Sequence, residues 1–447
     1  MVGRVAPWAE HTIWWHVYPL GFTGAERAAL PSGTPALHRL THLTAWLDYV
    51  VELGCSGLLL GPVFASQTHG YDTVDHFRID PRLGDDDDFD ALVAAASARG
   101  LRIALDGVFN HVGRAFPAFV AAEAAARAGP GTPASRWFKR DEASGDVAVF
   151  EGHEQLVELN HGEPAVVSYV TEVMRYWLGR GAAGWRLDAA YAVPPAFWAE
   201  VIPVVRQSHP GAWFLGEMIH GDYAAYAARA GLDSITQYET WKAIWSCLNE
   251  RNFYELEHAL GRHNAFCDAG LLPQTFVGNH DVTRLATILN DPRHLGHALA
   301  ILFCVAGVPS IYYGDEQGFR GVKEHRAGGD DEIRPAFPAS PADLAPYGWP
   351  TYRLHQRLIR FRRGHPWMAR ARTVTEHITS SALAVRVVPS PAGPGEGRQV
   401  LLLLNTGDDP VKFPVNAGSL EVAEVPDPDD PPADPLLVPP HAWTILA

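Results

Sequence analysis

The sequence has few cysteines, and none stands in a pattern that builds a disulfide framework or a metal site. Disulfide scaffolds are short and cysteine-rich, and cysteine-based metal sites use closely spaced ligands. We therefore predict reduced thiols in a core and no metal site. The four cysteines among the 447 residues are Cys55, Cys247, Cys267 and Cys304.

Positive charge is also scarce. The chain has 36 Lys and Arg against 51 Asp and Glu, a formal net charge of -15. A surface of that sign repels nucleic acid, anionic membranes and polyanionic substrates, so we expect none of these as partners. A neutral polymer such as a glucan is unaffected by the charge. The 14 Trp and 14 Tyr include flat faces on which sugars could stack, although core packing explains most of them.

No apolar run approaches the length of a transmembrane helix. Arg4 and Glu10 lead directly into Ile13-Trp14-Trp15, without the apolar region and small-residue cleavage site of a signal peptide. We therefore expect a cytoplasmic protein. A chain of 447 residues also exceeds the size of a single core, so we expect a large domain with smaller ones beside it.

Short apolar runs alternate with longer helix-like segments over most of the chain. The predicted strands are Thr12–Tyr18, Gly57–Leu60, Leu101–Asp106, Gly184–Asp188, Trp213–Glu217, Ser234–Tyr238, Thr275–Asn279 and Ser310–Tyr313. The predicted helices are Leu37–Leu53, Phe89–Ala98, Pro164–Leu178, Pro195–Gln207, Trp241–Leu260 and His294–Val305. Continuous apolar strands alternating with helices indicate an α/β protein with a covered parallel sheet, and eight units predict a closed (β/α)8 TIM barrel. A doubly wound open sheet is the alternative.

Two segments interrupt this alternation. About fifty residues between the third strand and Pro164, including Gly129-Pro130-Gly131-Thr132-Pro133, are too many for an ordinary βα loop. After His365 the pattern changes to short β-rich runs with proline-rich loops, which predicts an antiparallel β-sandwich. The predicted domains are a barrel over 1–106 and 161–365, an inserted domain B over 107–160 and a β-sandwich over 366–447. The aspartates at 85–88 precede a helix, so capping is favoured over a calcium site.

Polar residues follow the predicted strands at the points where they end. The active site of such a barrel forms at the carboxyl ends of its strands. Each residue alone could cap the next helix, but so many together favour a single site. The set is Tyr71, Asp72, Asp106, Asn110, His111, Arg186, Asp188, Glu217, His280 and Asp281.

These residue types suit the cleavage of a glycosidic bond, which needs one carboxylate at the anomeric carbon and a protonated carboxyl at the leaving oxygen. Arg186 lies two residues before Asp188 on the same strand face, so its charge should keep Asp188 ionised. Burial and neighbouring carboxylates should raise the pKa of Glu217, so that it can donate a proton near neutrality. Histidines nearby could hydrogen-bond the sugar hydroxyls, and Tyr71 could stack on the ring.

Four segments, in this order, resemble the signature regions of the α-amylase family. They are Asp106-Gly-Val-Phe-Asn-His111, Gly184-Trp-Arg-Leu-Asp-Ala189, Gly216-Glu-Met-Ile-His220 and Phe276-Val-Gly-Asn-His-Asp281, with further landmarks at Gly70-Tyr-Asp72 and Tyr312-Tyr-Gly-Asp-Glu316. The resemblance implies a retaining double displacement on α-glucosidic bonds. It makes Asp188 the nucleophile, Glu217 the acid/base and Asp281 the transition-state stabiliser. The residues expected to bind the sugar are Tyr71, His111, Arg186, His280 and Arg284.

Within the family the chain most resembles the neopullulanase and cyclomaltodextrinase group, through Phe197-Trp198 after the nucleophile segment and His220 after the acid/base. That group carries an N-terminal domain used in dimerisation, for which a first strand near residue 12 leaves no room; a homodimer is left open. Tyr191-Ala192 stands where many α-amylases have Lys-His, so we expect no calcium, despite Asn110, and no other cofactor.

Three functions remain to be weighed. The first is hydrolysis of maltooligosaccharides or cyclic α-glucans. The second is transfer of a glucosyl or maltosyl unit to a sugar acceptor, which uses the same three carboxylates. The third is a binding protein with an inactive site, which should have lost at least one of Asp188, Glu217 and Asp281. All three are present, so an enzyme is favoured, with an α-glucan oligosaccharide as the expected partner.

Overall fold

Eight parallel strands form the centre of the molecule. The computed structural model describes residues 6–128, 136–141, 144–326, 328–391 and 395–447. The strands lie in the order β10-β9-β8-β5-β2-β1-β12-β11, and a parallel bridge between Thr236 and Gln274 joins the two outer strands. This bridge closes the sheet, so the barrel is confirmed and the open sheet was wrong. The strands are β1 (Trp14–Val17), β2 (Gly57–Leu60), β5 (Arg102–Gly107), β8 (Gly184–Leu187), β9 (Trp213–Gly216), β10 (Ser234–Ile235), β11 (Gln274–Phe276) and β12 (Val308–Tyr312).

Two tryptophans fill the amino end of the barrel. The Trp14 and Trp213 rings stack with their centroids 5.1 Å apart among buried aliphatic side chains. Glycine at position 57 makes room for them, since a Cβ there would lie 2.5 Å from the Trp14 ring. With this end packed, polar side chains have access to the barrel from its carboxyl end.

Helices surround the barrel, close to the predicted positions for four of the six segments. These are α4 (Asp86–Ala98), α6 (Pro164–Gly179), α7 (Pro195–Ser208) and α12 (Leu295–Cys304). The other two predicted helices are each divided, into α2 (Leu40–Thr44) and α3 (Leu47–Leu53), and into α9 (Tyr238–Glu250) and α10 (Phe253–Asp268). Helices not predicted are α1 (Pro19–Phe22), α5 (Pro117–Ala128), α8 (Tyr223–Ala230), α11 (Leu285–Ile288) and α13 (Trp349–Gly364).

Local contacts explain where α9 ends and where α4 begins. Arg251 ends α9 in a left-handed conformation, φ 51°, and its guanidinium donates to Thr406 O in the C-terminal region. At the start of α4 the Asp85 carboxylate accepts from the backbone N–H of Asp88, and the Asp88 carboxylate accepts from that of Asp85. This reciprocal capping confirms the interpretation favoured for the aspartate run.

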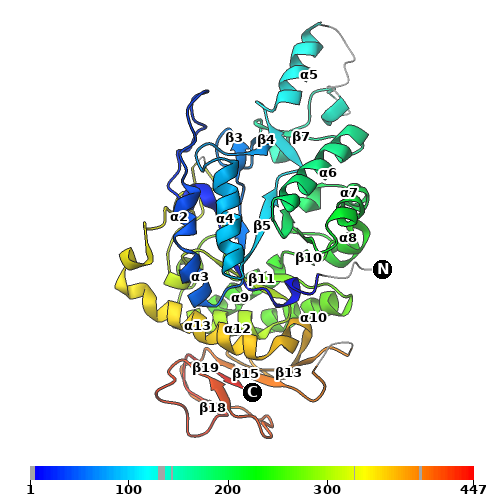
Figure 1. Ribbon diagram of the computed structural model, residues 1–447. Helices are drawn as coiled ribbons and strands as arrows, with labels where there is room; N and C mark the ends of the chain where they lie inside the picture. The colour runs from blue at the N-terminus through cyan, green and yellow to red at the C-terminus, as the bar shows by residue number, and fades with distance from the viewer. Residues whose placement is uncertain (1–5, 129–135, 142–143, 327, 392–394) are drawn as a thin grey trace.

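Two small structures flank the barrel. At its carboxyl end lie the pair β3 (Phe64–Ser66) and β4 (Thr73–Ile79), the pair β6 (His111–Gly113) and β7 (Leu156–Glu158), and α5 (Pro117–Ala128), which projects at the top of Figure 1. The segment Gly129-Pro130-Gly131-Thr132-Pro133, which was cited for the insertion, lies outside the described residues. At the other end, a five-stranded antiparallel sheet and a two-stranded sheet share an apolar core, which confirms the C-terminal β domain. Its strands are β13 (Ala371–Ile378), β14 (Ala382–Pro389), β15 (Val400–Asn405), β16 (Val411–Lys412), β17 (Val422–Glu424), β18 (Leu437–Val438) and β19 (Ala442–Leu446).

The C-terminal sheet packs on the barrel through α10, α12 and α13, below which it lies in Figure 1. In the part of the chain that the structure describes, none of the helices combines the length and apolar character needed to cross a membrane.

Candidate active site

Arg186 is the centre of a buried cluster at the carboxyl end of the barrel. Its Nη1 lies 2.7 Å from both carboxylate oxygens of Asp106 and 3.2 Å from Asp188 Oδ1. Its Nη2 lies 2.6 Å from Glu217 Oε1. Three carboxyl groups therefore surround one cation, in a place where only 3% of the Arg186 side chain is exposed.

The excess of carboxyl groups affects the protonation of Asp188. Burial raises the pKa of Asp188 well above its usual range, and Glu217 raises it further, although Arg186 acts in the opposite direction. Arg186 thus acts in the predicted direction, but against burial and the charge of Glu217. Asp106 and Glu217 share the same guanidinium, so Arg186 offsets only part of these effects on Asp188.

Further hydrogen bonds fix the Glu217 carboxyl group. Its Oε2 accepts from the backbone N–H of Ala189 at 2.9 Å, and its Oε1 accepts from the Tyr238 hydroxyl at 3.3 Å. Ala189 follows β8 in a left-handed conformation, φ 45°, which turns its N–H toward this carboxyl group. Tyr238 in turn accepts from Asn279 Nδ2 at 2.9 Å.

Asp281 is the most open of the three carboxylates, with 31% of its side chain exposed. Its Oδ2 lies 2.9 Å from His280 Nε2, and its Oδ1 lies 2.7 Å from an Nη2 of Arg334 and 3.8 Å from Lys323 Nζ. Burial opposes ionisation, yet the charges of His280, Arg334 and Lys323 outweigh it and hold the pKa of Asp281 well below its usual range. The pKa of Asp281 is thus shifted in the opposite direction to that of Asp188.

Tyr71 and His280 connect the two groups of carboxylates. The Tyr71 hydroxyl donates to Asp106 Oδ2 at 3.2 Å and also contacts His280 Nε2. The planes of the two rings are almost parallel, with an angle of 5° between them and centroids 5.5 Å apart. Burial raises the pKa of Tyr71, so the hydroxyl stays protonated. The contacts form a closed ring through Arg186, Asp106, Tyr71, His280, Asp281, Asn279, Tyr238 and Glu217.

The inserted segment supplies the other side of the site. Phe150 stacks on the ring of His111, with centroids 4.7 Å apart. Burial lowers the pKa of His111 to about 3, so the imidazole is neutral, and its Nε2 is buried without a hydrogen-bond partner. Beyond it, Tyr191 donates to Glu151 Oε1 at 2.8 Å and its ring lies 4.9 Å from that of His220.

Arg284 does not share these contacts. Its guanidinium is completely buried and donates to Tyr313 O, Asp315 Oδ1 and Ile333 O at 2.6–2.9 Å. These partners fix the loop that follows β12 and leave the guanidinium no exposed face for a sugar. The prediction that Arg284 binds substrate is therefore corrected to a structural role.

Some residues of the site were not predicted. Arg334 donates to Asp281 and to His280 O, and it pairs with Asp330 at 3.0 Å. Arg334 and Asp330 belong to a long loop without strand or helix periodicity, so no sequence pattern indicated these contacts. Tyr238 and Asn279 could have been found, because both end strand runs that were predicted.

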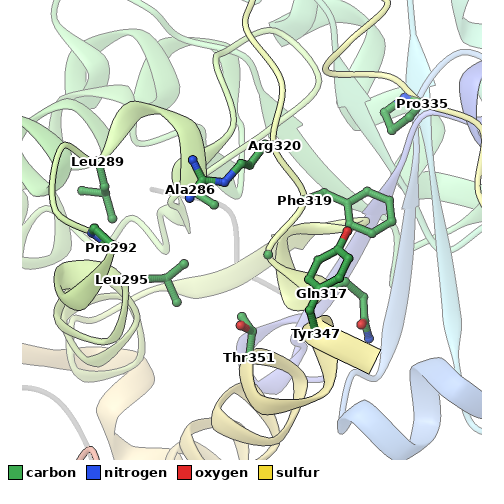
Figure 2. Close-up of a pocket in the computed structure, with 11 residues that line it drawn as sticks. Ala286, Leu289, Pro292, Leu295, Gln317, Phe319, Arg320, Pro335, Tyr347 and Thr351 are labelled. Atoms are coloured by element: carbon green, nitrogen blue, oxygen red, sulfur yellow. The ribbon is translucent and has the colours of Figure 1, made fainter. Parts of the chain in front are cut away.

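A separate pocket of about 680 Å³ lies on the flank of the barrel (Figure 2). Tyr347 and Phe319 lie in it beside Gln317, and Arg320 lines it further from these two rings (Figure 2). None of the three carboxylates lines it, so we do not place the cleaved bond there. Its lining residues are Ala286, Leu289, Pro292, Leu295, Gln317, Gly318, Phe319, Arg320, Pro335, Tyr347 and Thr351.

Comparison with known proteins agrees with this architecture. Residues 17–376 match the family model of the alpha amylase catalytic domain, which covers most of the chain. The protein therefore belongs to the α-amylase family.

Individual relatives show which group within the family the chain resembles. The chain is 30% identical to a cyclomaltodextrinase from a Bacillus species over 340 residues, 70% of this chain and 60% of the relative. It is 30% identical to neopullulanase 2 of Thermoactinomyces vulgaris over 346 residues, 71% of this chain and 58% of the relative. The match thus spans less than two thirds of these relatives, and it confirms the resemblance to their group. A solved cyclic α-maltosyl-(1→6)-maltose hydrolase from Arthrobacter globiformis shares the fold, with a TM-score of 0.80 at 24% identity over 99% of both chains.

Proposed function

We propose that the protein is a retaining α-glucoside hydrolase that acts on maltooligosaccharides or cyclic α-glucans. One observation carries the proposal: Asp188 and Glu217 contact the same buried guanidinium, while His280 and Arg334 beside Asp281 hold the pKa of that third carboxylate low. Two carboxyl groups in different protonation states are what a glycosidase requires. The names of the relatives support the choice of substrate.

In the first step the Asp188 carboxylate attacks the anomeric carbon while Glu217 gives its proton to the glycosidic oxygen. The carbon–oxygen bond breaks, the leaving sugar departs with the proton, and a glycosyl ester forms on Asp188. In the second step Glu217 takes a proton from water, whose oxygen attacks the same carbon and releases Asp188. Glu217 therefore has to be protonated, and Asp188 ionised, when the glycosidic bond breaks.

The other residues stabilise this sequence of steps. Positive charge develops on the sugar ring in both transition states, and the ionised Asp281 is placed to stabilise it. Tyr71, His280, His111 and Arg186 hold the sugar at the cleaved bond; the unpartnered Nε2 of His111 gives one hydroxyl a ready partner. No metal ion takes part in these steps. We also propose a cytoplasmic location, consistent with the four free thiols, and leave a homodimer open.

A product analysis tests this function. The protein is incubated with maltotriose, starch, pullulan, isomaltose, trehalose and cyclodextrins, and the products are separated; Asp188→Asn is the matched control. We expect maltotriose and cyclodextrins to be cleaved faster than granular starch, and the variant to be inactive. Products longer than the substrate would favour the transferase alternative. Absence of cleavage of every α-glucoside would refute the proposal.

A further inference from the structure

A second group of titratable side chains lies away from the active site, where the barrel meets the C-terminal β domain. Asp291 precedes the short helix η5 (Pro292–His294), which leads into α12. His441 lies directly before β19. His294 is buried, whereas His441, with 7% of its side chain exposed, and Asp291 are half-buried.

The donor atoms of these three residues converge. His294 Nε2 lies 3.0 Å from His441 Nδ1, and Asp291 Oδ2 lies 3.8 Å from the same nitrogen. One ligand atom from each residue lies within 4.8 Å of the other two. Ligands bound to one tetrahedral ion at about 2.0–2.2 Å are separated by roughly 3.3 Å. The observed spacings therefore suit a shared ion with little movement of the side chains.

A fourth residue orients one of the histidines. Asp408 Oδ1 lies 2.8 Å from His441 Nε2. A carboxylate accepts a proton there, so the lone pair of the imidazole is on Nδ1, which faces His294 and Asp291. Metal-binding histidines commonly donate their other N–H to a carboxylate in this way.

Two arginines face the same group. Arg293 donates to both oxygens of Asp291 at 2.6–3.0 Å, and Arg251 donates to Asp408 at 3.0 Å. With the backbone N–H of Arg293 included, Asp291 accepts four contacts, which fill the roughly four acceptor sites of a carboxylate. An ion at Oδ2 therefore takes the place of the Arg293 Nη2 contact. The alternative is a hydrogen bond between the two imidazoles, which needs no ion.

We propose that Asp291, His294 and His441 bind one divalent transition-metal ion, with Zn²⁺ as the best match, which fastens the C-terminal β domain to the barrel. Two imidazole nitrogens and one carboxylate favour Zn²⁺ over the oxygen-seeking Ca²⁺ and Mg²⁺. Water completes the coordination. The site is structural, and catalysis proceeds without it.

The test measures Zn²⁺ binding to the full chain after dialysis against a chelator. Isothermal titration with ZnCl₂ is expected to give one site per chain, with no corresponding heat from CaCl₂. His294→Asn and His441→Asn should abolish that site; asparagine tolerates the left-handed backbone at 441, φ 52°. Asp408→Asn should weaken binding by about 10–100-fold. The control is His258→Asn, at an exposed position on α10, which should bind as the native protein does.

Two further readouts distinguish this site from binding at other histidines of the chain, which has 21 in all. Zn²⁺ should raise the Tm of the native protein and of the control, but not of the His294 variant. Co²⁺ should give the native protein the intense visible bands of a four- or five-coordinate ion. Absence of a stoichiometric site, or equal affinity in the His294 and control variants, would overturn the proposal. Maltotriose turnover in the same samples should be independent of the metal, so failure here leaves the proposed hydrolase untouched.

Discussion

Arg186 lies between Asp188 and Glu217, with one guanidinium nitrogen 3.2 Å from Asp188 Oδ1 and the other 2.6 Å from Glu217 Oε1. A single cation thus holds the two carboxyl groups to which the two halves of the reaction are assigned. Burial and Glu217 raise the pKa of Asp188, and Arg186 lowers it. The predictions below depend on this balance and on the separate Asp281, whose pKa is lowered.

Replacing Asp188 with Ala removes the attacking group. Hydrolysis and transfer should both fall by several orders of magnitude, as for other nucleophile replacements. If Asp188 only capped a helix, its loss would cost about 0.5–2 kcal/mol of stability and little activity. Turnover and Tm measured on the same sample distinguish the two, and a folded variant with more than a few per cent of native activity would contradict the assignment.

Replacing Glu217 with Ala leaves the departing oxygen without a proton donor. Maltooligosaccharide cleavage should collapse, whereas a glycosyl fluoride or activated aryl glycoside needs no proton and should still glycosylate Asp188. The measurement is the ratio of rates on the two substrate types. Equal losses on both would show that Glu217 is not the acid.

The Asp281 charge should be visible in the pH profile. Activity requires ionised Asp188, whose raised pKa places the acid limb of kcat/KM above the pKa of about 3.9 for a free aspartate. Asp281 contributes to that increase. Asp281→Asn should therefore lower turnover far more than it weakens binding, and move the acid limb to lower pH. An unchanged limb would mean that the two carboxylates are not coupled.

The same pKa increase predicts a stability effect. A group whose pKa is raised on folding stabilises the protein below its unfolded pKa, and this contribution is lost as pH rises through the folded value. Asp188→Asn is neutral at every pH and avoids that loss. Its Tm should exceed the native Tm at neutral pH, and the difference should shrink on acidification toward pH about 4. A variant less stable than the native protein at neutral pH would show that the ionised Asp188 carboxylate does not destabilise the fold.

The barrel could be predicted because its eight strands are short apolar runs that alternate with helix-like segments. Asp188 and Glu217 directly follow such runs, and a strand end fixes the direction in which the next side chain is presented. Breaks inside helical patterns could not be predicted in the same way. The left-handed Arg251 depends on a contact with Thr406, 155 residues further along the chain.

Loop residues show the same limit. Arg334 reaches Asp281 from a loop 53 residues away, and no local pattern marks it. Arg284 was expected to bind the sugar, but the acceptors that bury its guanidinium belong to Tyr313, Asp315 and Ile333. The sequence shows Arg186 as the neighbour of Asp188, but it does not show that Asp106 and Glu217 share the same guanidinium.

The most direct test of the account is the configuration of the first product. Two successive displacements at the anomeric carbon restore its original configuration, and the two carboxyl groups should lie about 5–5.5 Å apart for this purpose. Proton NMR recorded within the first turnovers of maltotriose, before mutarotation, reports the anomer that is released. The account predicts the α anomer first, with the β anomer appearing later at the rate of mutarotation. Initial release of the β anomer would contradict Asp188 as the nucleophile and the double displacement with it.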